Sequence, residues 1–210
     1  MNEQERAEEH LRTIRRLMER GTIYRAISAP TALVGGLLAL VAGAVYSPGW
    51  TFHQLNGFLL IWVVVLLLTA GANTLFIFLG AQKRGEQVFS PSMKTALCAI
   101  APAFILGGIL TALFLVEVED TAADLLICAL WIVLYGMGLL ATSPFAPRSL
   151  VILGLAFFTS GLFVIVTAFV AQDPAGMSQG HIPSYLMAAT FGLYHLIYAA
   201  CVWPRKNSEP

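Results

Sequence analysis

The chain has 210 residues, of which 58% are hydrophobic and only 11% are charged. Soluble domains carry roughly a quarter charged residues, so this composition excludes an ordinary soluble protein and predicts that the lipid bilayer is the main solvent. The formal net charge is zero, but all 12 Lys and Arg residues fall on one side of a six-fold hydrophobic pattern. Because basic residues accumulate in cytoplasmic loops, this pattern predicts a bacterial inner-membrane protein with both termini in the cytoplasm.

Residues 1–28 form the first predicted element, a cytoplasmic amphipathic helix without the apolar core of a cleavable signal peptide. Its apolar residues Leu11, Ile14 and Met18 recur at helical spacing. The basic residues among them are Arg12, Arg15, Arg16 and Arg20. Three roles are open for this helix. It anchors the first span, it binds a cytoplasmic partner or a second copy of the chain, or it lies on the anionic inner leaflet.

Residues 29–204 are predicted to form an all-α bundle of six transmembrane helices, and residues 205–210 a cytoplasmic tail. A helix rises 1.5 Å per residue, so a hydrocarbon core of about 30 Å needs about 20 apolar residues. Six stretches meet this length, at about 27–46, 55–80, 95–116, 122–142, 150–171 and 183–203. Turn-forming residues separate them, and short connections predict antiparallel neighbours in contact with the lipid bilayer.

An internal repeat accompanies these spans. The pattern Ala-Pro followed by Gly-Gly at 29–36 returns at 101–108, and a weaker copy begins at Ala146. This spacing favours three helical hairpins of common orientation, related by an axis along the membrane normal. Chance similarity among apolar segments is the alternative. Small residues at one-turn spacing, Gly35, Ala39 and Gly43, predict a close approach between helices.

His195 is the one ionisable side chain deep within a predicted span. An unpaired ionisable group is costly in hydrocarbon, so its presence points to a buried polar site. The hydroxyl-bearing residues one turn away or at comparable depth are Tyr198, Tyr135, Thr159, Ser160 and Thr69. Two interpretations are open: a neutral histidine that is hydrogen-bonded for helix packing, or a proton relay, metal or haem ligand, or substrate contact.

The outer connections offer only a weak metal site. Their imidazole and carboxylate groups suit a divalent cation but have no tight ligand spacing. These residues are His53, His181, Glu117, Glu119 and Asp120. No second histidine lies at the depth of His195 to complete a haem site. The chain also lacks a P-loop, an HExxH sequence and a nucleophile elbow. We therefore expect no enzyme, no cofactor and no nucleic-acid partner.

Four short motifs together carry a family resemblance: LRxIRxLMER at 11–20, KRG at 83–85, LYG at 134–136 and FGxxHxxY at 191–198. On these motifs and their order, the chain resembles an uncharacterised family of bacterial six-span integral membrane proteins with an N-terminal cytoplasmic amphipathic helix. The resemblance implies the same architecture and draws attention to His195. It brings no reaction, substrate or cofactor with it.

Three functional hypotheses follow. The leading one is a non-enzymatic membrane anchor or sensor that binds a partner through its N-terminal helix. The second is a small-solute or proton-linked transporter that uses His195 and the midplane hydroxyls. The third is a metal- or haem-binding redox component. A cavity that reaches His195 would favour the second class, whereas a tightly packed environment would make the histidine structural.

Overall fold

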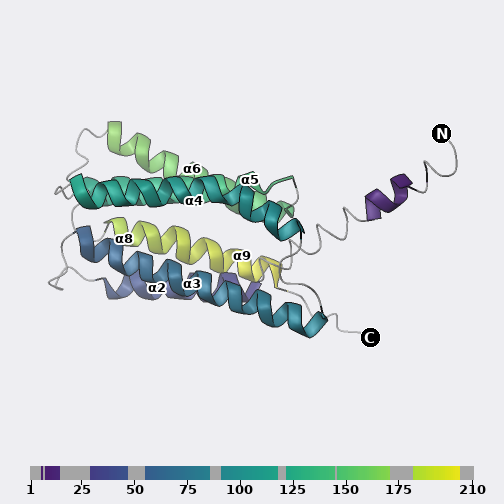
Figure 1. Ribbon diagram of the computed structural model, residues 1–210. Helices are drawn as coiled ribbons and strands as arrows, with labels where there is room; N and C mark the ends of the chain where they lie inside the picture. The colour runs from purple at the N-terminus through teal and green to yellow at the C-terminus, as the bar shows by residue number, and fades with distance from the viewer. Residues whose placement is uncertain are drawn as a thin grey trace.

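The computed structural model describes residues 6, 8–14, 29–46, 55–85, 91–117, 122–144, 146–170 and 182–203. Within these ranges the chain is helical, and the described segments contain no strand (Figure 1). The main helices are α2 (Ala29–Val45), α3 (Leu55–Arg84), α4 (Pro91–Glu117), α5 (Ala122–Ala141) and α6 (Arg148–Val170). The last span consists of α8 (Ile182–Met187), η1 (Ala188–Tyr194) and α9 (His195–Val202).

Five of these helical stretches are long and apolar enough to cross a membrane. They are Gly57–Lys83, Met93–Phe114, Asp124–Ala141, Arg148–Val170 and Ile182–Val202. The sixth apolar helix, α2, is shorter, with 17 residues, or about 26 Å of helix. The largest differences from the predicted spans are at the α3–α4 connection, where α3 continues to Arg84 and α4 begins at Pro91. Both extensions carry polar residues that hydropathy alone places in the loop.

Large apolar side chains cover the outside of the bundle. Phe169 on α6 is 86% exposed, and Leu67 on α3 and Ile105 on α4 are also mostly exposed. Soluble monomers rarely expose contiguous apolar patches beyond a few hundred Å². A surface of this kind fits contact with lipid and therefore a membrane protein.

The helices alternate in direction along the chain (Figure 1). The end of α3, the start of α4 and the start of α6 consequently share one end of the bundle with the end of α9. Lys83, Lys94 and Arg148 lie at this end, and Asp124 lies at the opposite end, at the start of α5. The charges of the described helices are thus divided between the two ends, as the sequence pattern predicts.

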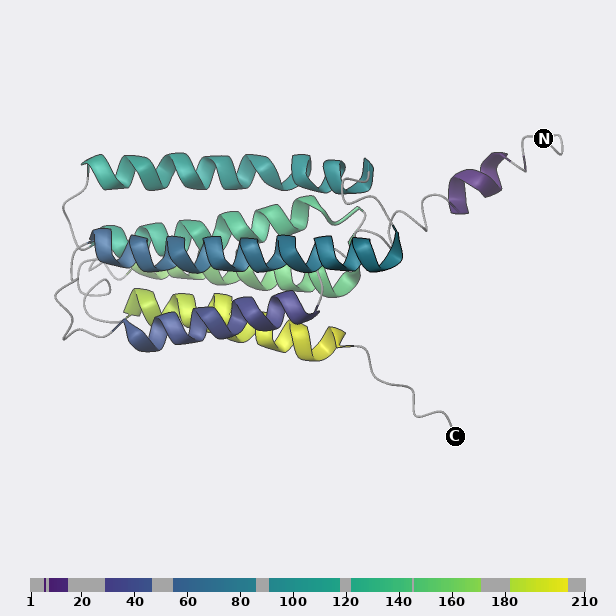
Figure 2. The same ribbon diagram turned by 60° about the horizontal axis from the view of Figure 1, so that its bottom comes forward.

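The bundle consists of two groups of helices. In one, α2 packs on α3 and on the η1–α9 part of the last span; in the other, α5 packs on α6 and α4. Figure 2 shows α4 at one edge of the bundle and α2 with the last span at the opposite edge. The third predicted hairpin differs from the first two, because α6 packs chiefly on α5 and not on the last span.

Glycines allow the closest helix contacts in both groups. A Cβ atom at Gly43 of α2 would lie 2.5 Å from the Ala188 Cβ atom, and one at Gly35 would lie 2.8 Å from Thr69 Cγ2. These are the close approaches that the spacing of Gly35 and Gly43 predicts. In the other group, a Cβ atom at Gly161 of α6 would lie 2.9 Å from the Val133 backbone nitrogen. At Gly161 only a residue without a side chain lets the two backbones meet, whereas at Gly35 and Gly43 the nearest atoms belong to side chains of the neighbouring helix.

The last span contains a π-helix, which the apolar pattern of the sequence does not predict. Residues Ala188–Tyr194 adopt this wider helical form between two α-helical segments. Gly192 within it packs against α2, where an added Cβ atom would lie 2.7 Å from Leu40 Cδ2. π-Helical turns inside α-helices occur frequently at functional sites. This one ends immediately before His195.

Of the predicted N-terminal helix, the structure describes residue 6 and residues 8–14, which are helical and exposed. Leu11 is 66% exposed and Ile14 is 53% exposed, with Arg12 between them. Arg15, Arg16, Met18 and Arg20 lie outside the described residues. The length and amphipathic character of this helix therefore remain predictions.

Candidate functional site

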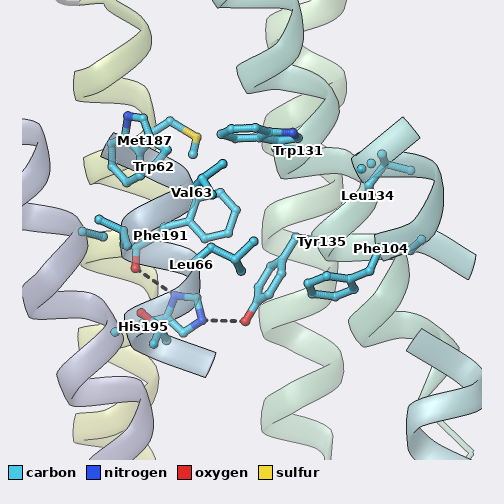
Figure 3. Close-up of a pocket in the computed structure, with 17 residues that line it drawn as sticks. Trp62, Val63, Leu66, Phe104, Trp131, Leu134, Tyr135, Met187, Phe191 and His195 are labelled. Carbon is cyan, nitrogen blue, oxygen red and sulfur yellow. Dashed lines mark hydrogen bonds between the residues drawn. The ribbon is translucent and has the colours of Figure 1, made fainter. Parts of the chain in front are cut away.

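His195 is held by two hydrogen bonds from opposite sides of its ring. Its Nδ1 atom lies 2.8 Å from the backbone oxygen of Phe191, one turn earlier. Its Nε2 atom lies 2.7 Å from the hydroxyl oxygen of Tyr135 on α5 (Figure 3). A carbonyl oxygen only accepts hydrogen bonds, so Nδ1 carries the hydrogen and donates it. In the neutral ring Nε2 is then an acceptor, and the Tyr135 hydroxyl donates to it.

Aromatic rings enclose this pair. Phe157 of α6 is fully buried. Its ring centroid lies 4.7 Å from that of Tyr135, 4.9 Å from that of Phe191 and 5.4 Å from that of His195. The Tyr135 and Phe157 planes meet at 65°, the edge-to-face arrangement that aromatic pairs favour. These contacts fix the orientation of the tyrosine and join α5, α6 and the last span around the histidine.

A cavity of about 230 Å³ lies beside this pair. Its wall combines residues of both helix groups, from α2, α3, α4, α5 and the last span. Figure 3 shows Phe191 and His195 on one side of it, Tyr135 and Phe104 on the other, and Leu66 between them. An apolar cavity of about 150 Å³ in a soluble protein stays dry and binds benzene. The present cavity is large enough for a substituted ring.

The two tryptophans in the cavity wall differ in their hydrogen bonding. Trp131 of α5 donates from Nε1 to Thr111 Oγ1 at 2.9 Å, and that hydroxyl donates to the Gly107 backbone oxygen at 2.7 Å. Trp62 of α3 is 3% exposed, and its Nε1 atom has no hydrogen-bond partner among the described residues. Buried polar groups are usually paired, so this free donor calls for an explanation.

Three residues of the predicted midplane site meet in the structure. Thr69, Tyr135 and His195 all line the cavity. The Thr69 side chain also packs against Gly35, which places its hydroxyl-bearing carbon at the α2–α3 contact. Residues from three spans that are far apart in the sequence thus share one wall.

The other three predicted residues do not line the cavity. Ser160 Oγ pairs with Tyr194 Oη at 2.8 Å, away from the cavity. Thr159 is exposed and donates to the Leu155 backbone oxygen of its own helix at 2.8 Å. Tyr198 is buried in the main apolar core, close enough to Tyr135 to interact with it electrostatically. Equal depth does not bring side chains together, because successive helical residues point about 100° apart.

Sequence reasoning also missed several wall residues, above all Trp62, Trp131 and Phe104. One signal was available for the tryptophans. Trp is enriched at the membrane interface, whereas Trp62 and Trp131 both lie well inside predicted spans. A tryptophan away from the interface suggests a packing or binding role.

The side chains of the weak outer-face metal site lie outside the part of the chain that the structure describes. His53, His181, Glu119, Asp120 and the side chain of Glu117 lie outside the described residues. Among the residues that are described, no group of three or more His, Cys, Asp and Glu side chains could hold a metal ion. At His195, a metal on Nε2 would have to displace the Tyr135 hydroxyl. Nδ1 already donates a hydrogen bond to the Phe191 backbone oxygen, so neither ring nitrogen is free to bind a metal.

Comparisons with protein families, with curated proteins and with solved structures gave no match. Functional inference for this chain therefore depends on the geometry of its own residues.

Proposed function

We propose that this chain is a six-span protein of the bacterial cytoplasmic membrane, with both termini in the cytoplasm, which binds a small membrane-soluble molecule beside His195 and Tyr135. The observation that carries the proposal is the cavity of about 230 Å³ that reaches this pair. It supports the ligand-binding class of hypothesis over a purely structural histidine. The described wall of the cavity contains no carboxylate, so proton-linked transport has less support than simple binding.

The size of the cavity makes an occupant favourable. In soluble proteins an empty apolar cavity destabilises the fold by about 24 cal/mol per Å³. The present space of about 230 Å³ opens to the side of the bundle, so an acyl chain or a ligand can enter it and make such contacts. The wall is stiffened by aromatic contacts, such as the stacked rings of Phe58 and Trp131, with centroids 6.4 Å apart. A ligand regains contacts that these side chains cannot make by collapsing.

Binding is testable with a brominated ring compound, because Trp62 and Trp131 line the cavity. We expect 1-bromo-4-butylbenzene to quench tryptophan fluorescence of the purified protein in detergent micelles, with saturation. The blocking variant is Gly108→Phe. Gly108 lines the cavity and is exposed, and a Cβ atom there meets nothing within 4 Å, so a phenylalanine ring fits at the cavity mouth without disturbing helix packing.

The matched control is Gly71→Phe. Gly71 on α3 is exposed, an added Cβ atom there also meets nothing within 4 Å, and it does not line the cavity. We expect saturable quenching to persist in Gly71→Phe and to disappear in Gly108→Phe. If the brominated compound quenches the fluorescence of the wild-type protein and of both variants to the same extent, it is dissolved in the micelle and the proposed function is wrong.

The proposed orientation has its own test. Lys83→Cys and Ser178→Cys place thiols in a predicted cytoplasmic connection and a predicted outer one, the latter outside the described residues. In a background without the three native cysteines, a membrane-impermeant maleimide should label Ser178→Cys in intact cells. Lys83→Cys should react only after the cells are permeabilised. The reverse pattern would exclude this orientation.

A second function, partner binding through the N-terminal helix, is favoured by a separate observation. Leu11 and Ile14 lie three residues apart, on one face of the described helical segment, and both are more than half exposed. Leu11→Glu/Ile14→Glu should abolish co-purification of a cytoplasmic partner or of a second, differently tagged copy. The exposed substitution Thr13→Glu is the control. Equal recovery with both variants would contradict this role.

A further inference from the structure

The hydrogen bonds at the polar end of the cavity restrict which kind of polar group a ligand can place there. This inference rests on the proposed function. Both ring nitrogens of His195 are in use, one with the Phe191 backbone oxygen and one with the Tyr135 hydroxyl. The hydroxyl hydrogen of Tyr135 is directed to Nε2, but its oxygen can still accept. The pair therefore presents an acceptor to the cavity, and a matching ligand must donate a hydrogen bond.

The cavity opens toward the side of the bundle between α3 and α4. Leu66 of α3 and Phe104 of α4 both line it, and they are 48% and 44% exposed. Gly108 of α4 lines it as well, with open space where a side chain would lie. In a membrane this side faces acyl chains. A ligand that comes from this direction must be soluble in hydrocarbon and uncharged, because a charge is costly there.

We propose that the ligand is an uncharged, membrane-soluble phenol or alcohol whose hydroxyl group donates its hydrogen to Tyr135 Oη. The apolar remainder of the ligand fills the space along Leu66 and Phe104 and extends toward the lipid.

Three probes of nearly equal shape test the class of ligand. 4-Butylphenol donates and accepts hydrogen bonds, 4-butylanisole only accepts, and butylbenzene does neither. Each competes with 1-bromo-4-butylbenzene for tryptophan quenching, with concentrations expressed per mole of detergent in the micelle. We expect the phenol to bind about fivefold to tenfold more tightly than the other two, the gain from one net hydrogen bond. Equal affinity of anisole and phenol would overturn the proposal, since the ligand would then not need to donate.

The double variant Tyr135→Phe/His195→Leu tests whether the hydroxyl group of the ligand binds at this pair. The double variant removes the Tyr135–His195 hydrogen bond without leaving either side chain unpaired, while the Phe191 backbone oxygen loses its hydrogen bond from Nδ1. Butylbenzene should still bind, which shows that the cavity is intact, and the advantage of the phenol should vanish. A persistent advantage would show that the hydroxyl group binds elsewhere and would overturn the assignment.

The proposed function and this inference fail in different ways. If no probe shows saturable binding that Gly108→Phe abolishes, the proposed function itself is wrong. If butylbenzene binds as well as the phenol does, the cavity binds ligands but the inferred class is wrong. The wild-type comparison of phenol with anisole decides this second question even if the double variant does not fold.

Discussion

Gly136 is the residue at which one added methyl group should have the clearest effect. It lies on α5 directly after Tyr135, against the backbone of α6. A Cβ atom there would lie 2.5 Å from the Phe158 backbone nitrogen and 2.8 Å from the Gly154 backbone oxygen. Ordinary contacts begin near 3.4 Å. Backbone atoms cannot rotate away, so in Gly136→Ala the two helices must separate by roughly 1 Å.

The free-energy cost follows from two opposing terms. Overpacking of a tight contact typically costs about 1–3 kcal/mol, whereas alanine is favoured over glycine within a helix by up to about 1 kcal/mol. We expect Gly136→Ala to lower the free energy of unfolding by about 1–2 kcal/mol. The same displacement would move the Tyr135 hydroxyl away from His195, now 2.7 Å distant, and should weaken binding of 4-butylphenol more than binding of butylbenzene.

The measurement is unfolding by sodium dodecyl sulfate in mixed micelles, followed by far-ultraviolet circular dichroism. The control is Gly71→Ala on α3, where an added Cβ atom meets nothing within 4 Å. The control should be unchanged or slightly more stable, since only helix propensity acts there. If Gly136→Ala unfolds with the same free energy as Gly71→Ala, the close contact between α5 and α6 does not exist as described.

Three further outcomes are expected from the same unfolding assay. Tyr135→Phe and His195→Leu should each destabilise the protein. Their double-mutant cycle should give a coupling energy of about 0.6–1.7 kcal/mol, which is the range for hydrogen bonds between membrane helices. A coupling energy of zero would contradict the 2.7 Å contact between the two side chains. Trp131→Phe and Thr111→Val should show a coupling of similar size, because their 2.9 Å hydrogen bond joins α5 to α4. Thr159→Val should change stability by less than about 0.5 kcal/mol, because Thr159 is exposed and bonds only within its own helix; a larger loss would indicate that it has an interhelical partner.

Much of the architecture could be predicted from the sequence. Helix positions, their apolar character and the division of charge between the two ends depend on local composition and on the 1.5 Å rise per residue. The close approaches at Gly35 and Gly43 were also predictable, since small residues at one-turn spacing have few other uses in an apolar helix.

Part of the candidate site could be predicted as well, because an ionisable residue in hydrocarbon needs a partner. That requirement pointed to His195 and included Tyr135 among the candidates. It could not select Tyr135 over Ser160 or Thr159 at similar depth. The choice depends on which helices are neighbours and on the rotation of each about its axis, and both are set by packing over the whole bundle.

The sequence by itself thus determined a membrane bundle of apolar helices with an unusual histidine. Only the tertiary structure decided that Tyr135 meets His195 across two helices, that a π-helix precedes the histidine, and that a cavity lies beside the pair. A cavity is the space left when side chains from several helices fail to fill their common volume. No single segment encodes it, so it becomes visible only when the helices are assembled.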